Sequence, residues 1–477
     1  MNKISSITPL AHTSERNGEH ATKPTISRSF IKNLPVEILG EIFVWCLNFQ
    51  SNNLSLPSIY EAPMLLCRVC GHWRRIAMSM PILWAAFSAY LHADTENSQF
   101  ISLINFWIKQ SRPYHLSFEL CASSPSQRRT FQQSFPLFLT EINRWHDVTL
   151  ELTPISCEQF LSAPLERASC LEALTLYNMG CTSIQVHQIP ATVNKFSQLR
   201  RLTIMQPLPL LNISWSQLTD IHLSTPLPID ECLQILNKCL NIMNCTLPRI
   251  RAPNAAVGEF TIVLPALLRL ILRSACDISE ILAHLTCPTL LHLSIDHNSW
   301  NNTQAPKTFN KFLIRSSCVL ETFHYFDEHI AECDLIQYIS APALRPLKFL
   351  AIHGLGAGVK TLNLLKLNEN RNAAIFMPSL ETLKIDVTGV PDGFFMKTIA
   401  SRLRFMGTCN TTRQVIGATL KNVDVWFRCQ GHRTFEEGVV ELCVEHGSDI
   451  KRAAELSTVH GVRISAHVNC DCWNIDY

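Results

Sequence analysis

Cysteine and histidine residues stand at two places in the sequence with the spacing that structural zinc sites use. The first is Cys67-x-x-Cys70 followed by His72. The second combines three pairs near the C-terminus, namely Cys429 with His432, Cys443 with His446, and Cys470 with Cys472. Thiolates and imidazoles two to four residues apart bind Zn²⁺ in structural sites. The first group has no second pair nearby, and Cys443 falls on the apolar side of an expected helix over Gly438 to His446. The sequence therefore favours core cysteines in the first group and unrelated core or surface residues in the second, and it predicts no bound metal and no cofactor.

Four histidines form a second set that could do chemistry, and they lie far apart in the chain, each directly after an apolar residue: His222, His292, His324 and His353. With Asp220, Asp296 and Asp386 in equivalent segments, an acid–base or metal site is conceivable. Residues on separate strands rarely converge on one ion without a pocket, so a polar recognition surface is favoured. The chain also lacks a Walker loop, a nucleophile elbow and a His-Glu-x-x-His motif. We expect no enzymatic activity.

The segments that carry these histidines repeat a short phrase, in which an apolar residue is followed after two positions by a second and after one more by a third. Copies begin at Leu171, Leu199, Leu218, Leu267, Leu290, Leu320, Leu347 and Leu380, and a degenerate copy begins at Leu240. The mean interval is about 26 residues, which is the period of leucine-rich repeats. Each phrase predicts a strand whose apolar residues face a core and whose intervening residues face the other way.

The segments between the phrases support a stacked arrangement, because several have apolar residues at helical spacing, as in Ile229 to Leu240. A strand with one return segment cannot bury its apolar face alone, whereas stacked copies share a continuous core. The prediction is an α/β fold, an irregular leucine-rich-repeat solenoid with parallel strands on the concave face and helices or coil on the convex face. Concave residues expected to contact a target protein are Arg201, His222, His292, His324, His353 and Lys384, of which Arg201 and Lys384 could meet phosphate.

A different pattern precedes the repeats, between Leu34 and Phe87. Pro35 suits the first turn of a helix, and the apolar residues behind it, from Ile38 to Leu47, recur at helical spacing. A second helical pattern runs from Leu65 to Ala77. Two or three short helices cannot bury this much apolar surface among themselves, so part of it must face the remainder of the chain or a partner.

These residues resemble an F-box. Its Leu-Pro-x-Glu-Ile-Leu opening matches Leu34 to Leu39, its Val-Cys-x-x-Trp-Arg matches Val69 to Arg74, and its Pro-x-Leu-Trp matches Pro81 to Trp84. The order of the three fragments is similar to that of fungal F-box proteins from mushroom-forming species, in which irregular leucine-rich repeats follow the box. The polar stretch Asn48 to Ser58 is longer than in compact F-boxes.

The resemblance implies a substrate receptor of an SCF-type ubiquitin ligase, a non-catalytic subunit that promotes ubiquitin-dependent protein catabolism. The box would dock a Skp-family adaptor, and through it a cullin, while the repeats hold a target protein. The adaptor-binding residues implied are Leu34, Pro35, Ile38, Leu39, Ile42, Phe43, Leu65, Leu66, Val69 and Trp73. Trp84 is instead expected to join the box to the helix over Phe100 to Ile108. The alternative is a leucine-rich-repeat scaffold that takes no part in ubiquitination.

Composition adds bounds rather than identity. The 477 residues contain 41 Lys and Arg against 39 Asp and Glu, so no global field favours nucleic acid or an anionic membrane. Nineteen cysteines are spread over the chain, many at apolar positions such as Cys46, Cys70, Cys232 and Cys239, which predicts reduced thiols and a cytoplasmic or nuclear location. The expected parts are a disordered tail (1–29), the F-box (30–90), the repeats (91–410), and the last repeats with a C-terminal cap (411–477).

Overall fold

The structure is a computed structural model of the 477-residue chain. It describes residues 34–47, 54, 57–91, 97–122, 128–178, 180–205, 207–297, 304–367, 376–404, 420–428 and 446–469. The predicted tail over 1–29, the helix predicted over residues 438–446 apart from His446, and the C-terminal cysteines all lie outside the described residues.

The N-terminal part is a small helical module. Its elements are α1 (Val36–Trp45), α2 (Leu66–Val69), α3 (Gly71–Met78) and the 3₁₀ helix η2 (Pro81–Trp84). Pro35 precedes α1 with an extended backbone, as expected for a residue that starts a helix. Leu39 and Phe43 are fully buried, and Phe43 packs against Trp73 with ring centroids 4.9 Å apart.

A long parallel sheet follows. Its strands are paired in the order in which they occur along the chain, with β7 as a side branch on β8. The strands are β1 (Ala86–Leu91), β2 (Leu116–Ala122), β3 (Trp145–Leu152), β4 (Ala173–Asn178), β5 (Arg201–Ile204), β6 (Asp220–Leu223), β7 (Leu227–Pro228), β8 (Asn244–Arg251), β10 (Arg269–Ser274), β12 (His292–His297), β13 (Thr322–Asp327), β14 (Phe349–Gly354), β15 (Thr382–Thr388), β16 (Asn422–Arg428) and β17 (Arg463–Asn469). The short strands β9 (Ile262–Val263) and β11 (Leu285–Thr286) pair with each other.

Helices occupy most of the segments between strands. They are α4 (Asn97–Gln110), α5 (Arg128–Leu139), α6 (Pro154–Ser162), α7 (Ser183–Val193), α8 (Ile229–Leu236), α9 (Ser279–His284), α10 (Ala305–Ser316), α11 (Glu332–Ile339), α12 (Val359–Leu365), α13 (Phe394–Arg404) and α14 (Gly447–His460). Short 3₁₀ turns, such as η4 (Ile142–Arg144) and η5 (Leu165–Arg167), lead into several strands.

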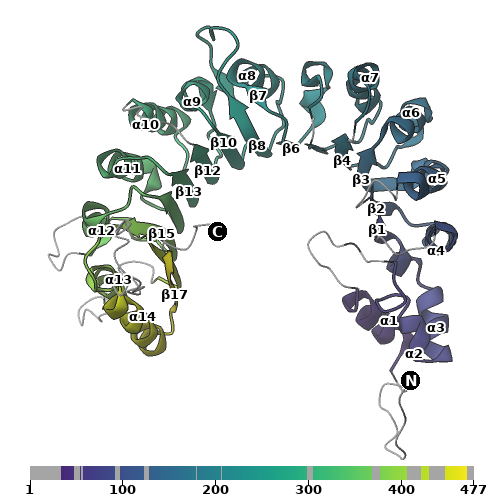
Figure 1. Ribbon diagram of the computed structural model, residues 1–477, viewed down its shortest axis with the longest axis horizontal. Helices are drawn as coiled ribbons and strands as arrows, with labels where there is room; N and C mark the ends of the chain where they lie inside the picture. Colours follow the sequence, from purple (N-terminus) through teal and green to yellow (C-terminus); the bar gives the residue numbers. More distant parts are fainter. Residues whose placement is uncertain are drawn as a thin grey trace, which may run out of the picture.

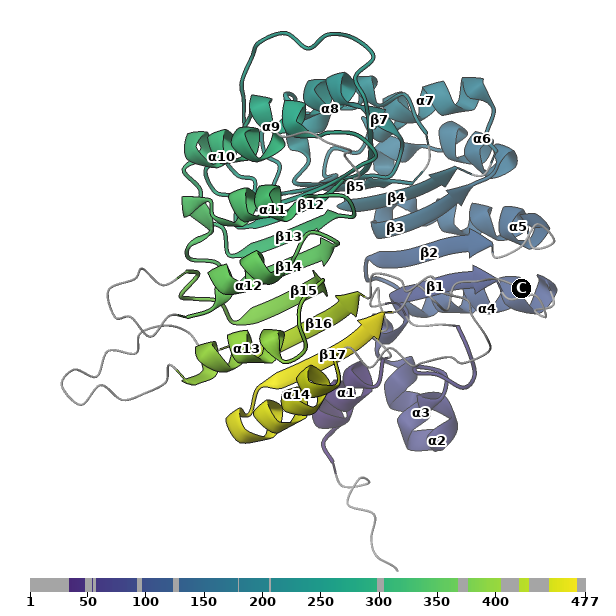
Figure 2. The same cartoon turned by 60° about the vertical axis from the view of Figure 1, so that its left-hand side comes forward.

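The sheet bends into an arc, with strands lining the inside and helices covering the outside (Figure 1). The helical module lies at one end of the arc and α14 with β17 at the other. Seen from a second direction, the strands lie one above another and run parallel (Figure 2). The predicted mixed α/β architecture with a parallel sheet is therefore confirmed.

Register places the phrase leucines in continuous buried rows. One row runs through Leu202, Ile221, Cys245, Leu270, Leu293, Phe323, Leu350, Leu383 and Val423. These side chains are at most 3% exposed and belong to one hydrophobic core. The alternation of buried and exposed residues along each strand explains why the phrase could be read from the sequence.

The sheet begins earlier than the predicted domain boundary at residue 90. β1 starts at Ala86 and pairs with β2 over its whole length, so the last residues assigned to the box already belong to the sheet. At the other end, β16 and β17 continue the same sheet. In β1 the residues Phe87, Ser88 and Ala89 are all buried, so burial does not alternate along this strand as it does in the phrases.

Three arginines tie successive outer segments together, of which Arg144 and Arg402 are buried and Arg315 is exposed. Arg144 donates to Tyr114 O at 2.8 Å and Ile108 O at 3.4 Å. Arg315 donates to Leu282 O at 2.6 Å, and Arg402 to Leu365 O at 2.7 Å. In each case the guanidinium reaches carbonyls at the end of the preceding outer segment, where helical carbonyls lack partners of their own. Burial lowers the pKa of Arg402 to about 10.

Gly354 ends β14 with φ of +120°, and a side chain there would lie 1.9 Å from Asp327 O of the neighbouring strand. Only glycine fits such an approach. The glycine-rich segment that starts at this residue connects β14 to α12.

Candidate functional site

The helical module presents an apolar surface. Large aliphatic residues lie on both the buried side and the exposed side of α1. Leu39, Phe43 and Leu47 point into the core, whereas Ile38 is 48% and Ile42 37% exposed. Leu65 at the start of α2 is 45% exposed and Val69 at its end 55%. We call the exposed set of Ile38, Ile42, Leu65 and Val69 the module face.

The ten residues predicted to bind an adaptor therefore divide by burial. Pro35 is exposed together with the four residues of the module face, and Leu34 and Trp73 are half-buried. Leu39, Phe43 and Leu66 are at most 5% exposed. These three lie beneath the surface, so their predicted place on a docking face is corrected to a place in the packing that supports it.

Trp45 is the last residue of α1 and is 79% exposed. A tryptophan this exposed is uncommon on a monomer, because its large apolar area stays in water. A second aromatic residue of the module, Tyr60, is 74% exposed and lies beside Arg68, whose guanidinium carbon is 5.9 Å from the ring centroid. Sequence reasoning missed both aromatic residues, because neither matches the repeated apolar spacing.

Trp84 occupies the junction between the module and the sheet, as predicted. It is fully buried, and its ring contacts Trp107 and Phe106 of α4 with centroids 4.9 and 5.4 Å apart. Its Nε1 donates to Ala77 O of α3 at 3.0 Å. One side chain thus joins the last helix of the module to the first helix outside the sheet.

The six residues predicted to contact a target all project from the sheet on the side opposite the core, which is the inner side of the arc. They form two groups. His292, His324, His353 and Lys384 lie on the four consecutive strands β12 to β15, whereas Arg201 and His222 lie on the adjacent strands β5 and β6, with β8 and β10 between the groups.

The first group is accompanied by aromatic residues that sequence reasoning missed. His324 stacks on Phe349 with centroids 4.9 Å apart and planes 2° from parallel. Trp426 of β16 lies 5.6 Å from His353 and stacks on His467 of β17 at 5.4 Å. We call this set of His324, His353, Phe349, Trp426 and His467 the inner aromatic patch. Register could have found it, since these residues occupy the same exposed rows as the predicted histidines.

Charges on the inner side are largely paired within the protein. Lys384 Nζ lies 3.1 Å from Asp424, and Arg201 lies 3.1 Å from Asp147. Asp386, whose side chain is 4% exposed, accepts from His353 Nδ1 at 3.0 Å and lies 2.7 Å from Arg428 Nη2. Burial acts to raise the pKa of Asp386, but the bonds from His353 and Gly354 and the nearby guanidinium outweigh it and hold that pKa below its usual value.

The histidines themselves favour the neutral form. Burial lowers the pKa of His222, His292 and His324, and nearby Arg273, Arg269 and the pair of His353 and Lys384 act in the same direction. Each of the three lies against its own neighbours and they share no pocket, so they offer separate donors and acceptors to a ligand.

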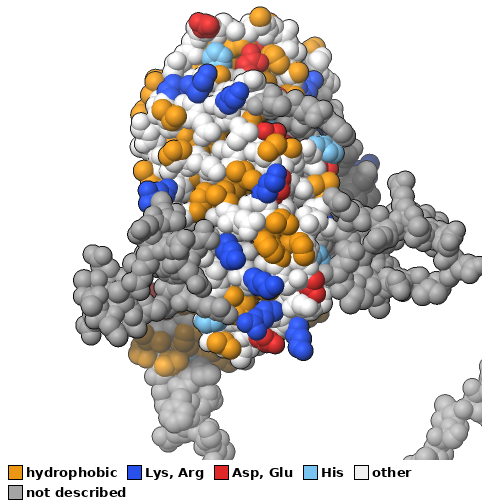
Figure 3. Space-filling view, turned by 90° about the vertical axis from the view of Figure 1, so that its left-hand side faces the viewer, with side chains coloured by type: hydrophobic (Ala, Val, Ile, Leu, Met, Phe, Trp, Pro, Cys, Tyr) orange, Lys and Arg blue, Asp and Glu red, His pale blue; other side chains and the backbone are white. Residues whose placement is uncertain are grey.

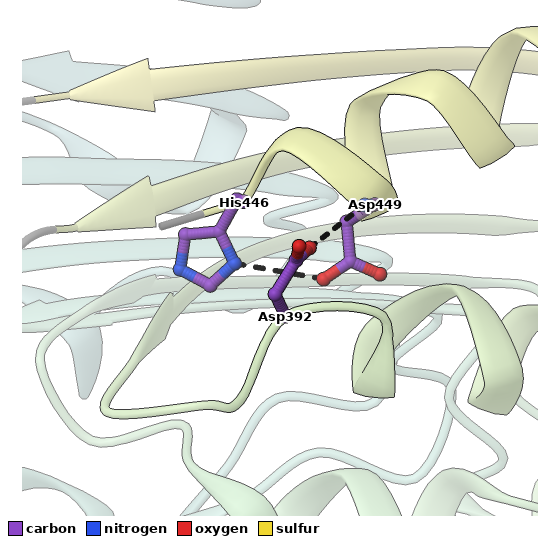
Figure 4. A group of neighbouring side chains, drawn as sticks. All are labelled: Asp392, His446 and Asp449. Atoms are coloured by element: carbon purple, nitrogen blue, oxygen red, sulfur yellow. Dashed lines mark hydrogen bonds and ion pairs between the residues drawn. The ribbon is translucent and has the colours of Figure 1, made fainter. Parts of the chain in front are cut away.

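The two sequence groups with zinc-ligand spacing fare differently. Cys67 is buried, whereas Cys70 is exposed and accepts a hydrogen bond from Trp73 N as the N-cap of α3. The prediction of a core position is therefore wrong for Cys70, and also for the exposed Cys46. Within the described residues, the only cluster with metal-ligand geometry is Asp392, His446 and Asp449 (Figure 4).

That cluster joins two helix starts. Asp392 accepts from Ser448 N at 3.0 Å and Asp449 N at 2.9 Å at the beginning of α14, and Asp449 accepts from Met396 N at 2.9 Å at the beginning of α13. His446 Nδ1 lies 3.5 Å from the second oxygen of Asp449. Two helix N-termini attract carboxylates and repel cations. We therefore assign the cluster to reciprocal capping of α13 and α14.

The outer face over the later helices carries Lys and Arg side chains that neutral and apolar ones separate (Figure 3). Lys307 and Lys311 of α10, Lys360 of α12 and Lys397 of α13 are exposed members. The intervening α11 begins with Glu332 and Asp334. The charge pattern on this face is therefore mixed in sign along the arc.

One pocket of the described part has a volume of about 570 Å³ and lies between the segments before β3 and β4, lined by Leu139, Asn143, Pro164 and Arg167 among others. It contains none of the predicted site residues. No helix in the described part of the chain is long and apolar enough to cross a membrane. Neither the comparison with family models nor the comparison with curated proteins gives a match to this chain.

Proposed function

We propose that this protein is a substrate receptor of an SCF-type ubiquitin ligase, in which the module is an F-box and the arc is an irregular leucine-rich-repeat solenoid. The module face would bind a Skp-family adaptor and, through it, a cullin. The inner side of the arc would hold a target protein. The chain would perform no bond chemistry and would act in the cytoplasm or the nucleus.

One observation carries the proposal. The motif that resembles an F-box splits into a buried half, which fixes the module, and an exposed half, which has large aliphatic residues on α1 and at both ends of α2. Four exposed aliphatic residues in a module of this size cost solvation free energy unless a partner covers them. A helical groove on an adaptor suits such a surface, because interface anchors are apolar residues surrounded by polar ones.

The proposed catalytic contribution is positional. A receptor that holds a target beside a ubiquitin carrier raises the effective concentration of the target's lysines at the reactive thioester. The inner aromatic patch is the best candidate for target contact, because its aromatic and imidazole rings supply rigid contact area at a low entropic cost. Its charged neighbours are already paired, so it would recognise a target mainly by ring contacts and neutral hydrogen bonds.

The test is co-purification of the full-length chain with a Skp-family adaptor. The double variant Ile38→Asp with Ile42→Asp should weaken adaptor binding by at least about 30-fold, the cost of losing one interface hot spot. A matched control is Ile314→Asp with Ile184→Asp, since these isoleucines are 72% and 71% exposed on outer helices. The control should bind normally.

Equal adaptor recovery from the double variant and the wild type, with the fold intact, would remove the F-box assignment. Adaptor binding without ubiquitin transfer to any bound protein in a reconstituted ligase would favour the scaffold alternative. The two outcomes separate the role of the module from the role of the arc.

A further inference from the structure

Two cysteines from neighbouring outer segments lie together at one edge of the sheet. Cys157 is on α6, which follows β3, and Cys181 lies directly before Thr182, the N-cap of α7, which follows β4. β3 and β4 are paired, with Leu152 opposite Asn178 at their ends. The two cysteines therefore follow equivalent strand ends, and they are 24 positions apart in the sequence.

The two thiols are hydrogen-bonded to each other. Cys181 Sγ also donates to Leu152 O at 3.2 Å, which fixes its position at the end of β3. Cys157 is fully buried, whereas Cys181 is partly exposed. A reagent in solution therefore reaches Cys181 first.

The surroundings shift the pKa values of the two thiols in opposite directions. The hydrogen bond from Cys157 lowers the pKa of Cys181, although partial burial opposes it. The same bond raises the pKa of Cys157, and burial adds to that effect. The N-terminus of α7 also favours negative charge near Cys181.

We propose that Cys157 and Cys181 form a redox-active dithiol, in which Cys181 reacts with hydrogen peroxide and Cys157 then closes a disulfide between α6 and α7. Disulfide formation by peroxide uses one accessible sulfur, which attacks the oxidant, and a protected sulfur next to it, which then resolves the sulfenic acid. The bond would tie two adjacent outer segments of the arc covalently.

The reaction balances with hydrogen peroxide as the only oxidant. The Cys181 thiolate, having lost its proton to solvent, attacks one peroxide oxygen. The O–O bond breaks, hydroxide leaves and takes a proton to become water, and Cys181 becomes a sulfenic acid. The Cys157 sulfur then attacks the Cys181 sulfur, the S–O bond breaks, and the departing hydroxide takes the Cys157 proton. Two thiols are oxidised and one peroxide is reduced to two waters.

Core cysteines provide the contrast. Burial raises the pKa of Cys232, Cys239 and Cys287 to about 12. Thiols of this kind are inert towards peroxide because almost none is present as thiolate. Reactivity should therefore be confined to a few positions despite the large number of cysteines.

The test uses the full-length wild-type protein, exposed to stoichiometric hydrogen peroxide at neutral pH, alkylated and digested without reductant. Mass spectrometry should detect a peptide pair linked through Cys157 and Cys181, and dithiothreitol should release it. Before oxidation, iodoacetamide should label Cys181 faster than the partly exposed Cys170, because the hydrogen bond from Cys157 lowers the pKa of Cys181 and so raises its thiolate fraction.

Variants separate the two roles. Cys157→Ala should leave a sulfenic acid at Cys181 that dimedone traps, and Cys181→Ser should abolish both the sulfenic acid and the disulfide. Cys170→Ser is the matched control and should behave as the wild type. Failure to find the linked peptide in folded wild-type protein, or equal labelling of Cys181 and Cys170, would overturn the proposal.

Discussion

The helical module and the arc use the same kinds of apolar residue in opposite ways. In the arc, the strand leucines are buried in rows that extend from one unit to the next. In the module, leucine and isoleucine at consecutive positions of α1 divide, so that Leu39 is fully buried and Ile38 is 48% exposed. Burial in the arc is continuous because each unit covers the next.

The difference shows what a partner surface requires. A stacked unit always has neighbours, and the last helix, α14, exposes mostly polar residues such as Lys451, Arg452 and Glu455, as a capping unit should. The module has only one neighbour, and its other side remains apolar. Several exposed aliphatic residues in the module therefore indicate a surface for a partner, whereas single exposed ones on outer helices are common in monomeric proteins.

The strongest test of the boundary between the two regions is Trp84→Ala. Loss of the ring contacts with Trp107 and Phe106 and of the bond to Ala77 should reduce the free energy of unfolding by about 4 kcal/mol. Chemical denaturation should then show the module unfolding before the arc. On the proposed function, adaptor affinity at low temperature should be spared. Loss of adaptor binding with the fold intact would instead place Trp84 in the interface.

A neighbouring pair of residues tests the buried and exposed halves of α1. Leu39→Ala should cost about 3 kcal/mol, because it leaves a cavity in the core. Ile38→Ala should change stability by less than about 0.5 kcal/mol, since surface substitutions away from special features are nearly neutral. Equal effects in thermal unfolding would mean that both sides of α1 are buried, which would contradict the exposed position of the module face.

Much of the arc could be predicted from the sequence, because burial on one side of a strand imposes alternation. The eight regular phrases each supply a strand of the sheet. The degenerate copy after Leu240 corresponds to β8, where Cys245 and Leu247 take the buried positions. Periodicity fails where a short segment carries no repeated apolar spacing, as in β1.

The candidate surfaces were less predictable, for a physical reason. Sequence spacing places residues on one side of a strand, but it does not say which strands are neighbours or how far each side chain is covered. The inner aromatic patch needs β13 to β17 in register before Trp426 meets His353. Likewise, Leu39 and Phe43 match the motif as well as Ile38 does, and only packing shows which of them is accessible.

A substitution at Arg402 tests how strongly successive outer segments of the arc are held together. Arg402 belongs neither to the module face nor to the inner aromatic patch. Arg402→Met removes three donors and leaves the carbonyls of Leu365, Phe376 and Met377 without them, so we expect a loss of about 2 kcal/mol. The matched control Lys397→Met alters an exposed cation on the same helix and should stay within about 0.5 kcal/mol. Urea denaturation measures both. An unchanged midpoint for Arg402→Met would show that these carbonyls find other donors.

The smallest expected effect concerns acid, and it arises from a buried network in the middle of the arc. His297 Nε2 lies 2.9 Å from the Tyr325 hydroxyl and 3.7 Å from Asp327, and all three residues are at most 2% exposed. His297 Nδ1 has no hydrogen-bond partner among the described residues. Protonation would place a second N–H where nothing accepts it.

Burial lowers the pKa of His297, and the carboxylates of Asp327, Asp277 and Asp296 oppose this only in part. A histidine with a lowered pKa in the folded state contributes stability that is complete above its ordinary pKa near 6.5 and declines as the pH falls through the folded value. Unfolding free energy should therefore decrease from pH 7 to pH 5. His297→Gln should make this decline shallower, whereas His187→Gln, at an exposed position on α7, should leave the slope unchanged. An equal slope in wild type and His297→Gln would assign the acid sensitivity of the arc to the half-buried histidines of its inner side.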